Sequence, residues 1–515
     1  MRRASVALAV VVLTACESEA PPPATPVRAA APSASAPVAS AAPPVRITPD
    51  APFRQAPPAA GPAVVFVAPK ITELHLKNGV RVLLVERHDL PIVSVRVVTS
   101  GGAGDVRAPA GAASLAGAML EQGTTTRSAL QISDAYEHLG ANHATWVGWD
   151  SGGASIKVTT EKLDAALGLL ADVVLHPTFP TEELERLRAR RLAAAQQEKN
   201  SPGSMASNAT AAALYGRAHP YGHSLSGEPE DIAKVDRLDL VRAHAVLFDP
   251  KTTAIVVAGD VSGDALDTKL EAAFGAWPVA APSQRAREAA PVSPQTGKDA
   301  HRLVVVDKPG AVQSVVRLAE VGVAANAPDR DALTVMNTIF GGMFSSRINM
   351  NLREAHAYAY GASSRFDKRH GAGPFVAGAN VKADTTAASI GELFREARAI
   401  QDELVSPEEL AGAKESLKLG LPAEFEGVES VTEALANLVV YKRPLDEYAT
   451  WPVRIDKVSA DDVRKAARAH LHPKTLRVIV VGDRAKLEAS FEPLHLGAVE
   501  ARDAYGDLVA PSVKQ

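Results

Sequence analysis

The sequence contains a single cysteine, Cys16, among its 515 residues. One cysteine excludes an internal disulfide and any metal site built from cysteines. Aromatic residues are also scarce, at 5% of the chain, and neither sign of charge dominates, because the formal net charge is -4. Such a chain gives no electrostatic case for binding the phosphates of a nucleic acid. The composition is that of a globular protein without a nucleic-acid partner.

Long apolar runs are missing too, since no stretch after the N-terminus approaches the roughly twenty residues of a membrane-spanning helix. Residues 1–16 instead resemble a lipoprotein signal peptide: Arg2 and Arg3 precede a short apolar segment, and the sequence LTAC ends at Cys16 as a lipobox does. We expect lipid on Cys16 to anchor the mature chain to a bacterial membrane, facing the periplasm. The alternatives are an ordinary signal peptide with a chance cysteine and a surface-exposed lipoprotein.

Residues 17–62 are rich in proline, alanine and serine, which predicts a semi-extended tether that buries no core. The remaining chain is too long for one core. Its fold class is predicted to be α+β, because strands and helices alternate in blocks, and this favours sheets covered on one face by helices over a doubly wound parallel sheet. The first elements expected are strands over 71–76, 80–85, 92–99 and 154–158, and helices over 110–122, 128–138, 161–175 and 181–199.

An internal repeat gives the domain organisation. Residues 232–260 align without a gap on residues 455–483, at a constant offset of 223, and both copies read as a helix, a Pro-Lys-Thr turn and a buried strand. The chain is therefore two related halves. We place them, in order, as an N-terminal half at 63–280, a linker at 281–299, a C-terminal half at 300–497 and a tail at 498–515.

One stretch of the second half, residues 340–360, carries a candidate peptide-binding pair. Two glycines allow a sharp loop, and Ser345 or Ser346 is placed to cap a helix that should follow. If that helix continues, Arg353 and Tyr360 lie two turns apart on one face. A guanidinium can bind a peptide carbonyl or carboxylate, and a phenol can donate to a developing oxyanion. The bland alternative is a solvated arginine beside a half-buried tyrosine.

Together, the two homologous halves and the Gly-Gly, Leu-Arg-Glu and Tyr360 pattern of the second half resemble the pitrilysin/insulinase family. The similarity is strongest to short bacterial and mitochondrial-processing-peptidase-like members. It extends from about residue 71 to 495 and includes GAASLAGAMLEQGT at 111–124. The resemblance implies that each half consists of two α/β sandwich domains with antiparallel-rich sheets, and that the halves form a clamshell around a peptide chamber.

Active members carry an HxxEH motif, whose histidines bind zinc and whose glutamate activates water, and a second glutamate about 75 residues later completes the site. Aligned on Met119-Leu120 and Gly123-Thr124, this chain has Ser114 and Ala118 at the histidine positions, Gly117 at the catalytic glutamate and Ala194 at the third ligand. Serine, glycine and alanine do not form a zinc site. The resemblance therefore implies a chain that holds no metal cofactor and is inactive alone.

Other histidines offer a weak alternative. His219 and His223 are four residues apart, and His138 lies close to His143 in sequence. Pro220 interrupts the helix that would align the first pair, no carboxylate falls at ligand spacing, and a structural histidine is the simpler interpretation of His219.

In the family, the Arg and Tyr of the C-terminal half orient the substrate and stabilise the tetrahedral intermediate, and this role passes by resemblance to Arg353 and Tyr360. Arg347 and Ser346 are secondary candidates for peptide contact. Some members divide the work between two chains. The leading hypothesis is therefore a non-catalytic subunit whose partner is a zinc-bearing homologue acting on unfolded peptides bound by strand addition. The alternative is a peptide- or protein-binding scaffold lipoprotein of the cell envelope without a role in proteolysis. No Ser-His-Asp or cysteine nucleophile arrangement supports a different hydrolase.

Overall fold

The computed structural model describes residues 66–278 and 302–510. The predicted lipidation site Cys16, the predicted tether at 17–62 and the predicted linker at 281–299 lie outside these ranges. Within them, no helix has the combined length and apolar character that crossing a membrane requires.

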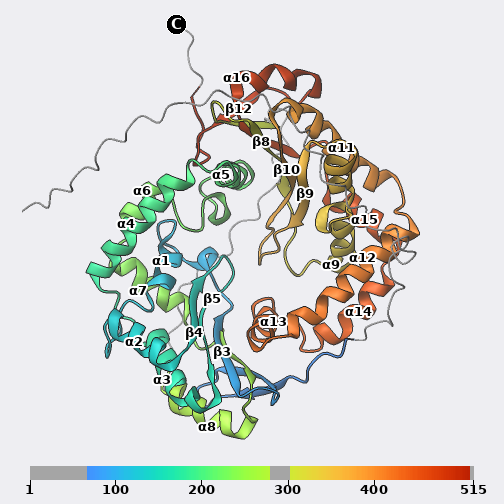
Figure 1. Ribbon diagram of the computed structural model, residues 1–515. Coiled ribbons are helices and arrows are strands. Elements are labelled where there is room, and N and C mark those ends of the chain that lie inside the picture. Colours follow the sequence, from blue (N-terminus) through green and yellow to red (C-terminus); the bar gives the residue numbers. More distant parts are fainter. Residues whose placement is uncertain (1–65, 279–301, 511–515) are drawn as a thin grey trace, which may run out of the picture. The chain divides into compact units, whose positions relative to one another are not determined.

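A six-stranded sheet organises the first half, with strand order β1-β2-β6-β3-β5-β4. Figure 1 labels its neighbouring strands β3, β5 and β4. Only the β2–β6 pair is parallel among its neighbours. Runs of valine and leucine form the central strands because both faces of these strands are covered, whereas β4 is an edge strand with a polar start. The strands are β1 (Thr72–His75), β2 (Arg81–Glu86), β3 (Ile92–Thr99), β4 (Asn142–Val147), β5 (Gly152–Thr159) and β6 (Thr253–Gly259).

The helices of the first half follow the capping signals in the sequence. Ser128 accepts a hydrogen bond from the amide of Gln131 at the start of α2, and Gly140 ends that helix in the left-handed conformation. The helices are α1 (Ala112–Met119), α2 (Ala129–Leu139), α3 (Leu163–Leu175), α4 (Thr181–Glu198), α5 (Pro202–Tyr215), α6 (Pro229–Lys234), α7 (Arg237–Leu247) and α8 (Gly263–Phe274).

The second half repeats this plan with a sheet of order β12-β7-β11-β8-β10-β9. Its strands are β7 (Leu303–Asp307), β8 (Gln313–Val321), β9 (Ala359–Phe366), β10 (Pro374–Lys382), β11 (Arg477–Gly482) and β12 (Val499–Arg502), and its helices are α9 (Arg330–Asn337), α10 (Arg347–Asn349), α11 (Thr386–Asp402), α12 (Pro407–Gly420), α13 (Val428–Val440), α14 (Glu447–Lys457), α15 (Ala460–His470) and α16 (Arg484–Leu487).

The repeat predicted from sequence is confirmed by the elements it contains. α7 and α15 begin 223 residues apart, and the strands β6 and β11 that follow them hold equivalent central places in the two sheets. The α+β class with two homologous, antiparallel-rich halves is therefore confirmed. β12 lies in the range expected to be a tail, where it pairs in parallel with β7.

Each sheet has two different apolar covers. On one face of the first sheet lie helices of the same half, including α3 and α8. The other face packs against α13, which comes from the second half of the sequence and contributes Val431 and Leu435. The second sheet mirrors this: α11 and α15 belong to its own cover, whereas α5 from the first half brings Met205 and Ala209 to the opposite face.

Candidate functional site

Helix α1 carries the three positions at which the resemblance places the HxxEH residues. Ser114 and Ala118 lie one turn apart on α1, and both are half-buried. The hydroxyl of Ser114 lies 2.9 Å from the carbonyl oxygen of Leu225 and 3.0 Å from that of Gly111. The first ligand position is thus bonded to neighbouring backbone.

Arg191 of α4 fills the space beside these positions. Its Nη1 donates to the Ser114 hydroxyl at 2.7 Å, and its Nη2 donates to the Ser114 carbonyl at 3.0 Å. Ala194, the position expected for a third ligand, follows one turn later on α4 and is exposed. A permanent cation therefore lies against the position of the first zinc-binding histidine, where a second cation would be repelled.

Gly117, at the position of the catalytic glutamate, has no room for a side chain. A Cβ atom at this residue would lie 2.8 Å from Cγ2 of Val147 and 3.2 Å from the backbone carbon of Trp146. The glycine lets α1 pack closely against the edge strand β4. A side chain at this position would require Val147 and the neighbouring backbone of β4 to shift.

The residues present do not fit a zinc ion. Across 66–278 and 302–510, no group of three or more His, Cys, Asp or Glu side chains is arranged to hold a metal. His219 accepts the amide of Tyr221 at 3.0 Å and stacks on Tyr215, so its role is structural. His143 instead forms an ion pair with Glu121 and stacks on Tyr136 at 3.6 Å.

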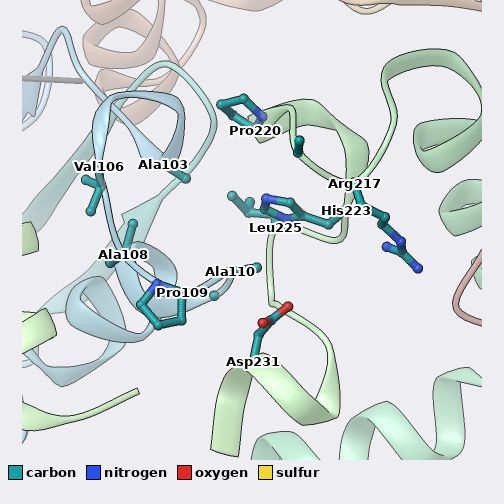
Figure 2. A pocket seen from close by; sticks show the side chains of 13 residues that line it. Ala103, Val106, Ala108, Pro109, Ala110, Arg217, Pro220, His223, Leu225 and Asp231 are labelled. Carbon is teal, nitrogen blue, oxygen red and sulfur yellow. The ribbon is translucent and has the colours of Figure 1, made fainter. Parts of the chain in front are cut away.

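A cavity of about 320 Å³ opens beside the start of α1. Figure 2 shows His223 in its wall, between Leu225 and Arg217. Arg217 is neutralised by Glu228 and Asp507, and His223 Nδ1 bonds the Ser224 carbonyl at 2.9 Å. The remaining wall is made mainly of small apolar residues, so the cavity contains no second ligand set.

The second half presents the Arg/Tyr pair differently from the sequence-based expectation. The helix that starts at α10 continues only as a π-helical turn, Met350–Ala355, and Tyr360 lies on strand β9. The amide of Tyr358 bonds the carbonyl of Leu352 at 2.8 Å, and Ala357 has a φ of 52°, which turns the chain out of the helix. The expectation of one helix face carrying both residues was therefore wrong.

Both side chains are nevertheless accessible. Tyr360 is 90% exposed, and the Arg353 side chain is 40% exposed. Arg353 stacks over the ring of Phe344, with 4.7 Å between the guanidinium carbon and the ring centre, and lies 3.2 Å from the carboxylate of Glu354. The stacking restricts the arginine while leaving donors to a ligand, because a guanidinium carries five of them. Sequence reasoning missed Phe344.

The two secondary candidates are structural. Arg347 forms a bidentate ion pair with Glu409, at 2.7 and 2.9 Å, which raises the pKa of Arg347 and lowers that of Glu409. Ser346 is fully buried, and its hydroxyl makes no hydrogen bond, so it neither caps the helix through its side chain nor contacts a peptide. The side-chain cap predicted for Ser346 was therefore wrong, whereas a peptide contact by Arg347 stays a prediction.

Two family models match this chain, one after the other along the sequence. The family model described as Insulinase (Peptidase family M16) matches residues 81–227. The family model described as Peptidase M16 inactive domain matches residues 234–417. An uncharacterised zinc protease of Mycobacterium leprae is 28% identical over 294 residues, which span 57% of this chain and 65% of that protein. A non-peptidase homologue of Helicobacter pylori is 23% identical over 415 residues, or 79% of this chain and 93% of its own.

Solved structures agree with the fold. A peptidase M16 inactive domain from Pseudomonas fluorescens is 25% identical, with a TM-score of 0.72 over 80% of this chain and 98% of its own. A protease from Helicobacter pylori is 20% identical, with a TM-score of 0.73 over 80% and 99% of the two chains. With both domain models matched in sequence order and no zinc ligand at the expected positions, the chain belongs to the insulinase (peptidase M16) family as an inactive-type homologue.

Proposed function

We propose that this chain is the non-catalytic, substrate-binding subunit of a heterodimeric zinc peptidase. Its partner is a homologue that carries intact zinc ligands, and the substrates are unfolded peptides. Arg353 and Tyr360 of this chain complete the partner's active site.

One contrast supports this proposal. The degenerate metal positions are crowded, because Arg191 bonds Ser114 and Val147 lies where a side chain at Gly117 would begin. Arg353 and Tyr360, by contrast, remain accessible. The 90% exposed Tyr360 and the partly exposed, Phe344-stacked Arg353 contribute little to the core, so both are available for contact with another molecule.

Each of the two groups has a separate chemical task. Arg353 has a flat array of donors suited to a peptide carbonyl or carboxylate, and so orients the bound peptide. The Tyr360 hydroxyl donates one hydrogen bond to the carbonyl oxygen that gains negative charge when the peptide bond is attacked. Both groups act on the substrate without a proton acceptor or a metal in this chain.

The proposed location is a bacterial membrane, reached through lipid on Cys16. Residues 17–62 are Pro/Ala-rich and, if extended at about 3 Å per residue, reach over roughly 100 Å. The folded halves would thereby act at a distance from the lipid, on the periplasmic side.

The test is a mixing experiment. Hydrolysis of an unfolded peptide is measured for residues 17–515 alone, for a homologue with an intact HxxEH motif encoded beside this chain, and for their mixture. We expect activity only in the mixture. Arg353→Ala or Tyr360→Phe in this chain should lower kcat of the mixture by about 10²-fold, as loss of an oxyanion donor does.

Two results would contradict the proposal. Stoichiometric zinc and peptide hydrolysis by residues 17–515 alone would show an autonomous enzyme. A mixture that is active but indifferent to both substitutions, or inactive while the two chains still bind the peptide, would favour the scaffold function.

A further inference from the structure

Two arginines occupy the same place in the two sheets. Arg96 of β3 pairs with Val256 of β6, and Arg317 of β8 pairs with Ile479 of β11. Val256 and Ile479 are themselves related by the repeat offset of 223. Arg96 and Arg317 are therefore equivalent by register, and each faces the helix contributed by the other half of the chain.

In the first sheet the surroundings neutralise the arginine. The Arg96 guanidinium lies 4.7 Å from the ring centre of Trp146 on β4 and 3.8 Å from the carboxylate of Glu433 on α13. The Trp146 ring and the Glu433 carboxylate compensate the charge of Arg96, although its buried Nε makes no hydrogen bond. The first-half arginine therefore has both an aromatic ring and an anion within the protein.

The second sheet replaces both partners. Trp146 on β4 pairs with Gly153 on β5, and Gly153 pairs in turn with Val98 on β3. Val98 is two residues beyond Arg96. In the second sheet, Ala319 is two residues beyond Arg317 and pairs with Val376 on β10, which pairs in turn with Arg365 on β9. Arg365 therefore holds the place that Trp146 holds in the first sheet. A second cation thus stands where the first half has an aromatic ring.

The covering helix also differs. In place of a glutamate, α5 offers Arg317 only neutral acceptors: the Ser207 hydroxyl at 3.0 Å and the Gly203 carbonyl at 3.1 Å. Across the described ranges, neither Arg317 nor Arg365 has a carboxylate within 4.0 Å of its guanidinium. Burial, together with the charge of Arg365, lowers the pKa of Arg317 to about 10. Two adjacent positive charges are left without an anion.

These two arginines line a cavity of about 250 Å³ on the open part of the sheet. Its other walls include Ser363, Gly361 and Asn380, which supply small or neutral polar surface and no acid. The absence of bulk at the glycine leaves space for a ligand group, and the serine and amide side chains can donate hydrogen bonds to it. Charge, donors and space all suit an oxyanion.

We propose that this cavity binds a carboxylate of the peptide that the chain holds, an inference that rests on the proposed peptide-binding function. Gly361 follows Tyr360 directly on β9, so the cavity adjoins the residue that meets the reacting bond. Arg365 is five residues beyond Tyr360 on β9, at most about 17 Å along the strand, because β9 shifts its register against β10 near Tyr360. The carboxylate therefore lies about five residues from the bond to be cut. It is supplied either by the peptide's C-terminus or by an Asp or Glu side chain.

The experiment measures binding of fluorescent peptides to residues 17–515 by anisotropy, without a partner. Three ten-residue peptides differ only in charge: a free C-terminus without acidic side chains, the same peptide amidated, and the amidated peptide with one glutamate five residues from its centre. We expect the amidated neutral peptide to bind about tenfold more weakly than at least one acidic peptide, which corresponds to about 1.4 kcal/mol. The acidic peptide that binds more tightly identifies the source of the carboxylate.

Arg365→Gln should abolish this preference, because the exposed Arg365 side chain supplies one of the two charges. Lys474→Gln is the matched control, since it removes the same charge from an exposed residue outside the cavity and should keep the preference. Arg365→Trp, which recreates the first-half pair, should also lose it. Equal binding of charged and neutral peptides would overturn this inference alone. Failure of all three peptides to bind would overturn the peptide-binding function as well.

Discussion

Arg191 donates two hydrogen bonds to Ser114, one to its hydroxyl at 2.7 Å and one to its carbonyl at 3.0 Å, and these bonds join α4 to α1. In the described ranges the guanidinium has no carboxylate within ion-pair distance, and burial lowers its pKa. A cation held only by neutral oxygens now stabilises the two helices from which active members of the family bind their metal.

Replacing Arg191 by alanine should destabilise the fold by about 1–3 kcal/mol, because the Ser114 hydroxyl loses its donor and α4 loses its contact with α1. Urea unfolding followed by circular dichroism measures the change. Arg190→Ala is the control, since Arg190 is exposed on the same helix and should change stability by less than about 0.5 kcal/mol. Equal urea midpoints for the two variants would show that the hydrogen bonds of Arg191 do not stabilise the fold.

Gly117→Ala should cost about 1–3 kcal/mol, because the added methyl group overlaps Val147 and the backbone of β4. Gly168→Ala in α3 is the matched control: nothing lies within 4 Å of a Cβ there, so the change should stabilise the helix by about 0.5–1 kcal/mol. In thermal melts, the melting temperature should fall for Gly117→Ala and rise for Gly168→Ala.

The same overlap predicts that rebuilding the HxxEH motif fails. A variant with histidine at 114 and 118 and glutamate at 117 and 194 should bind less than stoichiometric zinc in equilibrium dialysis, because the glutamate at 117 displaces β4 and Arg191 repels the metal. Stoichiometric zinc with an unchanged melting temperature would refute this prediction.

Two arginines of the Arg/Tyr region should respond in opposite ways. Arg347→Ala removes a bidentate, partly buried ion pair with Glu409 and should lower the free energy of unfolding by about 1–3 kcal/mol. Arg353→Ala removes an exposed side chain and should leave stability within about 0.5 kcal/mol. A large loss for Arg353→Ala would indicate a structural role in place of a peptide-binding one.

The contribution of His472 to the free energy of unfolding should depend on pH. Its hydrogen bond to Glu320 at 2.7 Å raises the pKa of His472 above the unfolded value. Stability from this group is fully present below the unfolded pKa, about 6.5, and is lost as the pH rises through the higher folded pKa. His472→Gln should therefore destabilise more at pH 5.5 than at pH 8.5.

The difference should stay below about 1 kcal/mol, because the histidine is half exposed and solvent screens the pair. A larger loss for His472→Gln at the higher pH would contradict the assigned direction.

Sequence reasoning reached the fold because the two halves repeat their elements at a fixed spacing, and because helices such as α4 carry strong local signals. It missed α5, since Pro202 was taken only as the end of α4. In the structure Ser201 caps a new helix whose first residue is that proline. It also missed β4, whose polar start gives no alternating pattern.

The site shows the same division between local and tertiary information. The substitutions at the zinc positions followed from the resemblance to the family, once the chain was aligned on Met119-Leu120 and Gly123-Thr124. The sequence did not predict that Arg191 would lie against these positions. α4 contains four arginines, and only the packing of α4 on α1 determines which of them bonds Ser114. Tyr360 was expected on a helix because the left-handed residue that ends the helical segment is Ala357 and not a glycine, so the sequence lacks the usual signal for a helix end.

The exchange of α13 and α5 between the two sheets couples the folding of the two halves. α13, residues 428–440, covers one face of the first sheet, so a chain that ended at residue 278 would leave that apolar face bare. α5 of such a chain would in turn have no second sheet to pack against. Neither half can therefore bury all of its apolar surface alone, and the two halves complete their cores together.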